Sequence, residues 1–121
     1  MQTEALLSTF FSMLTQIKLY HWSTMQYGVH KALDDLHSSL SDKVDSFVES
    51  YMGRFKKQPL PSMTLKMEAV NDISKLEKYL ETARDSLKTI AKSVSKESQL
   101  LNILDEMIAE IDKTVYLIHL K

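Results

Sequence analysis

The sequence has no cysteine, and only 2 glycines and 2 prolines occur among its 121 residues. Without cysteine the chain can form no disulfide, no thiolate metal site and no cysteine nucleophile, so any bound metal must be held by His, Asp and Glu. So few glycines and prolines exclude the repeated tight turns of an all-β fold. The chain is therefore expected to be helical.

A strong net charge is also missing, because 15 Lys and Arg residues nearly balance 16 Asp and Glu residues and leave a formal charge of −1. No positive field would hold a polyanion, so a nucleic-acid partner is not expected. No apolar run approaches the roughly 18 residues of a membrane span, and the N-terminus does not resemble an export signal. We therefore expect a soluble, cytoplasmic protein with no membrane partner.

The apolar residues that are present recur at three- and four-residue steps, which predicts amphipathic helices. The first two helices are expected over residues 4–22 and 29–52. A third is expected after a cap at Asn71 or Asp72, and a fourth after Ser95. At 44% hydrophobic and 26% charged residues, the composition suits one globular domain over residues 1–121.

The ends of these helices carry weaker signals. Thr3 is expected to cap the first helix, and Gly53 is placed to end the second in a left-handed conformation. Pro59 and Pro61 prevent the helix from continuing, which makes 54–62 part of the one long connection. Residues 63–70 are expected to form a short helical turn within it.

Three of the inward-facing stripes are used below. The second helix should bury Val29, Leu33, Leu36, Leu40, Val44, Phe47 and Tyr51. The first helix should bury Leu7, Phe10, Phe11, Leu14, Ile17 and His21. The fourth should bury Leu101, Leu104, Ile108, Ile111, Val115 and Ile118. Four such helices, with the long connection between the second and third, predict an all-α, antiparallel, ferritin-like four-helix bundle. Architecture alone names no function.

The residues that could bind a metal ion are concentrated on the second helix. His30, Asp34, Asp45 and Glu49 fall within an arc of roughly 100° on one flank of that helix. They form two pairs at the four-residue spacing that lets both side chains reach one ion, and the pairs lie about 22 Å apart along the helix. One copy cannot close both pairs on the same metal, whereas two copies packed antiparallel across a two-fold axis can.

His21, near the end of the first helix, could complete the pair of His30 and Asp34. A set of His and carboxylate ligands without sulfur suits Fe(II), and Zn(II) or Mn(II) would be tolerated as substitutes. Taken singly, His21 has an ordinary explanation as a partly buried histidine, and the acids as solvated surface residues.

These residues resemble the signature of the Dps-type miniferritins of the ferritin-like superfamily: His21-Trp22, then His30-x3-Asp34, then Asp45-x3-Glu49. The resemblance implies that His21, His30 and Asp34 face Asp45 and Glu49 of a two-fold mate. Leu100-Leu101-x2-Leu104 and the residues after it also look like the last helix of the family. The turn between the first two helices is shorter than the family usually has.

The resemblance implies Fe(II) oxidation by peroxide or dioxygen, in a ferroxidase that stores or detoxifies iron and protects against oxidative stress. It implies self-association, as a homodimer at least and as a dodecamer if the family's shell forms. We interpret Trp22 as a packing residue, and the resemblance places it near the iron. The lysine-rich N-terminal extension of DNA-binding members is missing, so no DNA binding is carried over. The alternative is a non-catalytic helical scaffold or partner-binding protein.

Overall fold

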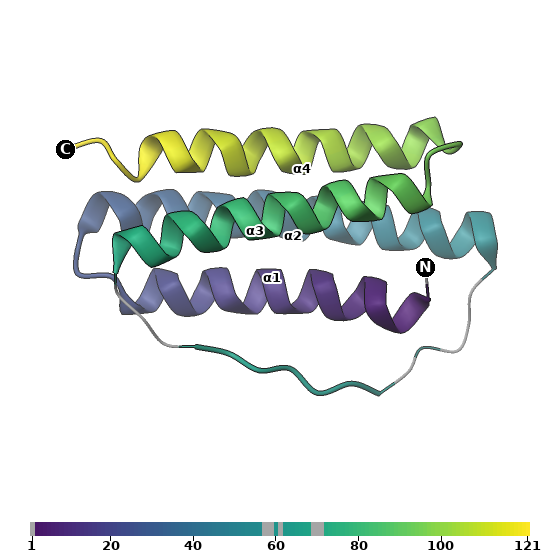
Figure 1. Ribbon diagram of the computed structural model, residues 1–121, viewed down its shortest axis with the longest axis horizontal. Helices are drawn as coiled ribbons and strands as arrows, with labels where there is room; N and C mark the ends of the chain where they lie inside the picture. The colour runs from purple at the N-terminus through teal and green to yellow at the C-terminus, as the bar shows by residue number, and fades with distance from the viewer. Residues whose placement is uncertain (1, 57–59, 61, 69–71) are drawn as a thin grey trace.

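The computed structural model describes residues 2–56, 60, 62–68 and 72–121. These residues form four helices and no strand: α1 (Thr3–Ser23), α2 (Tyr27–Phe55), α3 (Ile73–Ser93) and α4 (Ser98–Leu117). Figure 1 shows α1 and α4 running in one direction and α2 and α3 in the other. Because α1 packs on α2, α2 on α4, and α4 on α3, neighbouring helices are antiparallel. The described chain is thus an antiparallel four-helix bundle, as the sequence predicted.

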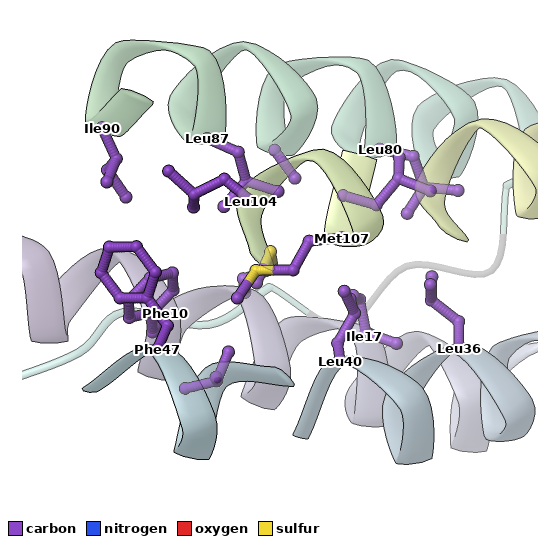
Figure 2. Close-up of a cluster of buried hydrophobic side chains, with 14 of the residues drawn as sticks. Phe10, Ile17, Leu36, Leu40, Phe47, Leu80, Leu87, Ile90, Leu104 and Met107 are labelled. Carbon is purple, nitrogen blue, oxygen red and sulfur yellow. The ribbon is translucent and has the colours of Figure 1, made fainter. Parts of the chain in front are cut away.

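The core lies along the axis of the bundle, where all four helices contribute fully buried side chains. Figure 2 shows this region, with Phe10 from α1 and Phe47 from α2 in an edge-to-face contact at a centroid distance of 5.3 Å. Every position expected to face inward on the second helix is buried: Val29, Leu33, Leu36, Leu40, Val44, Phe47 and Tyr51. Burial of this continuous apolar face is the main stabilising contribution to the bundle.

The expected end of the second helix was wrong. Gly53 lies inside α2, and Lys56 ends the helix with a φ of 54° and an N–H that donates to the Met52 carbonyl at 2.7 Å. The extra turn is retained because it lets Phe55 pack against Tyr51, with ring centroids 5.0 Å apart. Packing therefore outweighs the preference for glycine in the left-handed conformation.

Of the two helix starts predicted from capping residues, one was wrong and one was confirmed. Thr3 is the first residue of α1 and not its cap, which is Gln2 with no side-chain hydrogen bond. Asp72 does cap α3, because its carboxylate accepts hydrogen bonds from the backbone N–H groups of Ser74 and Lys75. Asp72 was one of the two residues expected there.

The helical turn expected over 63–70 is not formed in its described part, residues 63–68; residues 69 and 70 lie outside the described residues. The segment 62–68, which we call the strap, instead runs beside α1 (Figure 1). Gln16 of α1 fixes it: the side-chain amide donates to the Glu68 carbonyl at 2.6 Å and accepts from the Glu68 N–H at 3.0 Å. These two bonds satisfy the backbone N–H and C=O groups of Glu68.

On the last helix, every second position of the expected inward-facing stripe is replaced by the residue that precedes it. Leu101, Ile108 and Val115 are only partly buried, whereas Leu100, Met107 and Thr114 are buried. The helix packs against both α2 and α3, so its apolar face is wider than a single line. Thr114 can be buried because its hydroxyl donates to the Glu110 carbonyl at 2.9 Å.

Phe11 of α1 was also predicted to face inward, and it is 47% exposed. None of the helices in the described ranges has the length and apolar character to cross a membrane.

Candidate metal half-sites on α1 and α2

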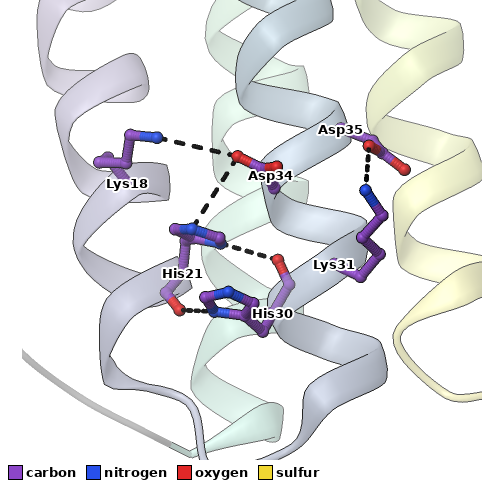
Figure 3. Close-up of polar contacts among 6 residues, drawn as sticks. All are labelled: Lys18, His21, His30, Lys31, Asp34 and Asp35. Atoms are coloured by element: carbon purple, nitrogen blue, oxygen red, sulfur yellow. Dashed lines mark hydrogen bonds and ion pairs between the residues drawn. The ribbon is translucent and has the colours of Figure 1, made fainter.

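His21 and His30 are brought together where the antiparallel helices α1 and α2 meet at one end of the bundle. Their rings stack with centroids 3.8 Å apart and planes inclined by 18°. The two residues also exchange hydrogen bonds, His21 Nδ1 to the His30 carbonyl at 2.7 Å and His30 Nδ1 to the His21 carbonyl at 2.8 Å. Figure 3 shows this reciprocal arrangement.

The reciprocal bonds fix the tautomer of both rings. A carbonyl oxygen can only accept a hydrogen bond, so each Nδ1 carries the hydrogen and each neutral ring keeps its lone pair on Nε2. Metal-binding histidines commonly have this arrangement, in which the second ring nitrogen donates to a backbone carbonyl and so fixes the orientation of the ring. In both rings Nε2 is therefore the nitrogen that is left without a hydrogen.

Asp34 lies next to these rings, one turn after His30 on α2. Its Oδ1 is 3.9 Å from His21 Nε2 and 3.9 Å from Lys18 Nζ, and its side chain is 45% exposed. Figure 3 shows Lys18 of α1 extended toward Asp34. We call His21, His30 and Asp34 the first predicted half-site, and the carboxylate of Asp34 is already paired with the ammonium of Lys18.

Lys18 is a residue of this half-site that the sequence interpretation missed. It lies three residues before His21, one turn earlier on the same side of α1, and this spacing was the available signal. Its ammonium also lies 5.8 Å from the centroid of the Trp22 ring. Trp22 was interpreted as a packing residue, but its side chain is 69% exposed.

Asp45 and Glu49, the predicted second half-site, lie further along α2 and are both exposed. The described chain does not bring them to His21, His30 and Asp34. Among the residues that the structure describes, no group of three or more His, Asp and Glu side chains is arranged to hold a metal ion. The half-sites therefore remain separate within one copy.

His37, one turn after Asp34 on α2, completes the ionisable groups near the first half-site. Burial lowers the pKa of His37 from 6.5, and the positive charge of Lys18 lowers it further, while the carboxylate of Asp34 opposes both effects. The neutral imidazole of His37 is therefore favoured beside the first half-site.

The described residues thus form a helical bundle in which the buried His21 lies beside the partly buried His30 and Asp34 between α1 and α2, while Asp45 and Glu49 are exposed further along α2. The chain belongs to a family of unknown function, DUF5856, whose match covers residues 21–118. The matched region begins at His21 and includes all five predicted ligands. Neither the curated proteins nor the solved structures provided a match.

Proposed function

We propose that this protein binds Fe(II) at a site shared by two copies and oxidises it, as a ferritin-like bundle of the Dps type. The observation that carries the proposal is the reciprocal pair of His21 and His30. Because each Nδ1–H donates to a backbone carbonyl, each imidazole can bind a cation only through Nε2. Asp34 adds a carboxylate at 3.9 Å from one of those nitrogens.

The second half of the site would come from Asp45 and Glu49 of another copy. Both acids are exposed on α2, at the four-residue spacing that lets two carboxylates reach one ion. Two antiparallel copies would place them opposite His30 and Asp34, and symmetry would generate two equivalent sites. The antiparallel helix pairs, with a connection between the same-direction helices α2 and α3, fit the ferritin-like arrangement.

In the proposed reaction Fe(II) is the substrate and hydrogen peroxide or dioxygen is the oxidant. With peroxide, two Fe(II) ions each give up one electron, the O–O bond breaks, and two protons are taken up to form two waters. Asp34, Asp45 and Glu49 would stabilise the additional positive charge of Fe(III). His21 and His30 would supply the nitrogen ligands. Zn(II) or Mn(II) would bind the same ligands without the same turnover.

The test is Fe(II) oxidation followed by absorbance, for wild type and for the double variant Asp45→Asn with Glu49→Gln. These substitutions keep side-chain size and remove two negative charges from the exposed surface, so we expect the bundle to fold and turnover to fall at least tenfold. A matched control, Asp105→Asn with Glu106→Gln, removes the same charges from exposed positions of α4 and should retain the wild-type rate.

Equal rates for wild type and the α2 variant would remove the site assignment. A chain that stays monomeric and carries no metal after purification would instead favour the non-catalytic scaffold. In that case the ion pair of Lys18 with Asp34 would satisfy the carboxylate within one copy.

A further inference from the structure

The strap, residues 62–68, alternates between apolar and polar side chains. Met63, Leu65 and Met67 are partly buried, whereas the residues between and beside them are exposed: Ser62, Thr64, Lys66 and Glu68. A period of two is typical of an extended chain that lies with one side against a surface. The strap therefore lies on the bundle as a single extended strand, with its apolar side turned inward.

The backbone of this strand has few partners. Within the described ranges, the peptide groups of 62–67 form no hydrogen bond, and only those of Glu68 are held, by the side-chain amide of Gln16. Unpaired N–H and C=O groups along an extended chain are a template for pairing with another extended chain. The strap thus has an edge to which a second strand can add.

The surface of α1 beneath the strap carries no charge. No Asp, Glu, Lys, Arg or His occurs between Glu4 and Lys18, although the solvent-facing side of a surface helix usually carries charged residues. The strap covers part of this neutral face, since the sulfur of Met63 contacts the hydroxyl of Ser8 and Glu68 is bonded to Gln16. The neutral face of α1 therefore already accepts an extended chain with alternating apolar side chains.

A groove of about 330 Å³ lies between α1 and α3 next to the strap. Ser8 lines the groove and also contacts Met63, so the strap borders the groove. α1 and α3 pack less closely than the other adjacent helix pairs, because most of the side chains between them are short. None of the lining residues is charged, and the short ones are Ser8, Thr9 and Ser12 of α1 with Thr82, Ala83 and Ser86 of α3.

We propose that the strap and this groove together bind an extended peptide segment of a partner protein. The segment adds as a second strand to the edge of the strap and places alternate side chains in the groove. Those side chains are uncharged, because the groove has no charged residue to pair with a buried charge. The inference goes beyond the proposed function and does not depend on iron binding.

The geometry favours a chain from another protein over the strap of a second copy. In a second copy Met63, Leu65 and Met67 are already turned toward its own bundle, so the same side chains could not also enter the groove. A free peptide has both sets of alternate side chains available. The partner segment should share the alternation of the strap, which is the pattern that this neutral surface already accepts.

Binding of a labelled peptide to the full chain, followed by fluorescence anisotropy, tests the proposal. The probe has the sequence of residues 62–68 with both ends blocked. The control peptide has the same composition, but its two methionines and its leucine are consecutive, which destroys the alternation. We expect the probe to bind about tenfold more tightly than the control, or better.

Methylation of backbone nitrogens in the probe separates strand pairing from a general hydrophobic contact. A strand pairs with its neighbour through every second residue, so one set of alternate N–H groups faces the strap and the other set faces away. One version of the probe is N-methylated at its second, fourth and sixth residues, and another at its third and fifth. One of the two versions should lose about tenfold in affinity or more, while the other binds like the parent probe.

Two tryptophan variants of the protein test the location of the site. Thr82→Trp places a large ring at the exposed rim of the groove and should weaken probe binding by about tenfold or more. Ser46→Trp, at an exposed position of α2 outside the groove, is the matched control and should bind like wild type. Both positions are exposed, so both variants should keep the helical content of wild type in circular dichroism.

Failure of the probe to bind, or equal affinity of the two methylated versions, would overturn strand addition. Equal binding by the probe and the rearranged control would overturn the required alternation. Wild-type affinity in Thr82→Trp would overturn the placement in the groove. Self-association of the chain that excess probe reverses would assign the strap to a second copy and overturn the choice of partner.

Discussion

Replacement of Gln16 by Leu should release the strap from α1 while leaving the bundle folded. Gln16 is 6% exposed, and its amide makes two hydrogen bonds with the backbone of Glu68, at 2.6 and 3.0 Å. Leu keeps the helix propensity and most of the volume of the side chain but can make neither bond. The expected change is therefore confined to the attachment of residues 62–68.

The magnitude follows from those two bonds. A neutral hydrogen bond contributes about 1 kcal/mol net, so the attachment should weaken by about 2 kcal/mol. Glu68 is exposed, so water can replace the lost partners and no buried group is left unsatisfied. The apolar Leu side chain recovers part of the loss within the core, and the global free energy of unfolding should change by no more than about 1 kcal/mol.

Limited trypsin digestion separates the local effect from the global one. Lys66 is an exposed residue of the strap, and cleavage after it requires the strap to open. A loss of about 2 kcal/mol should speed this cleavage roughly thirtyfold, while urea unfolding moves little. Ser8→Ala, which removes only a 3.7 Å contact with the sulfur of Met63, is the control and should cleave at the wild-type rate. An unchanged cleavage rate in Gln16→Leu would refute the reasoning.

Three further predictions concern stability and pH. Burial raises the pKa of Tyr79 from 10.0 to about 12, so the stability that its neutral hydroxyl contributes is fully present below pH 10 and is lost as pH rises toward 12. In alkaline unfolding scans, the free energy of unfolding of Tyr79→Phe should fall by about 1–2 kcal/mol less than that of wild type. Because burial lowers the pKa of His37 from 6.5, the unfolded chain binds the proton more readily, and the free energy of unfolding falls as pH drops below 6.5. In urea unfolding at a series of pH values, His37→Gln should reduce this dependence on pH, and an unchanged dependence would contradict the prediction. Asp72→Ala removes the cap of α3 and should lower the unfolding free energy by about 1 kcal/mol, whereas Asp72→Asn should stay close to wild type.

The sequence predicted best where apolar periodicity decides the outcome. On α2 the three- and four-residue steps run without interruption from Val29 to Tyr51, and each of those positions is buried. On α4 apolar residues occupy adjacent lines, so the pattern could not separate Leu100 from Leu101. Periodicity predicts which face of a helix is apolar, but the packing of the neighbouring helices determines which residues of that face are most deeply buried.

The parts that were missed depend on partners distant in the chain. From the sequence alone Gln16 would be assigned to the surface, because its hydrogen-bonding partner Glu68 is distant in the chain. In the same way, α2 ends only at Lys56 because Phe55 packs against Tyr51. The joining of His21 and His30 was inferred from their types and positions, but the hydrogen bond from each ring to the backbone carbonyl of the other residue could not be. Such contacts follow from the docking of α1 on α2, which local sequence does not encode.

Complementation between two inactive variants tests most directly whether a second copy completes the site. One variant, His30→Ala with Asp34→Ala, retains the acids of the other half-site; the second, Asp45→Ala with Glu49→Ala, retains the histidine half. Each alone should fail to oxidise Fe(II), whereas random mixing should restore about a quarter of the wild-type sites, because half of the dimers are mixed and each has one intact site. A mixture as inactive as its components, despite measured subunit exchange, would contradict the shared site.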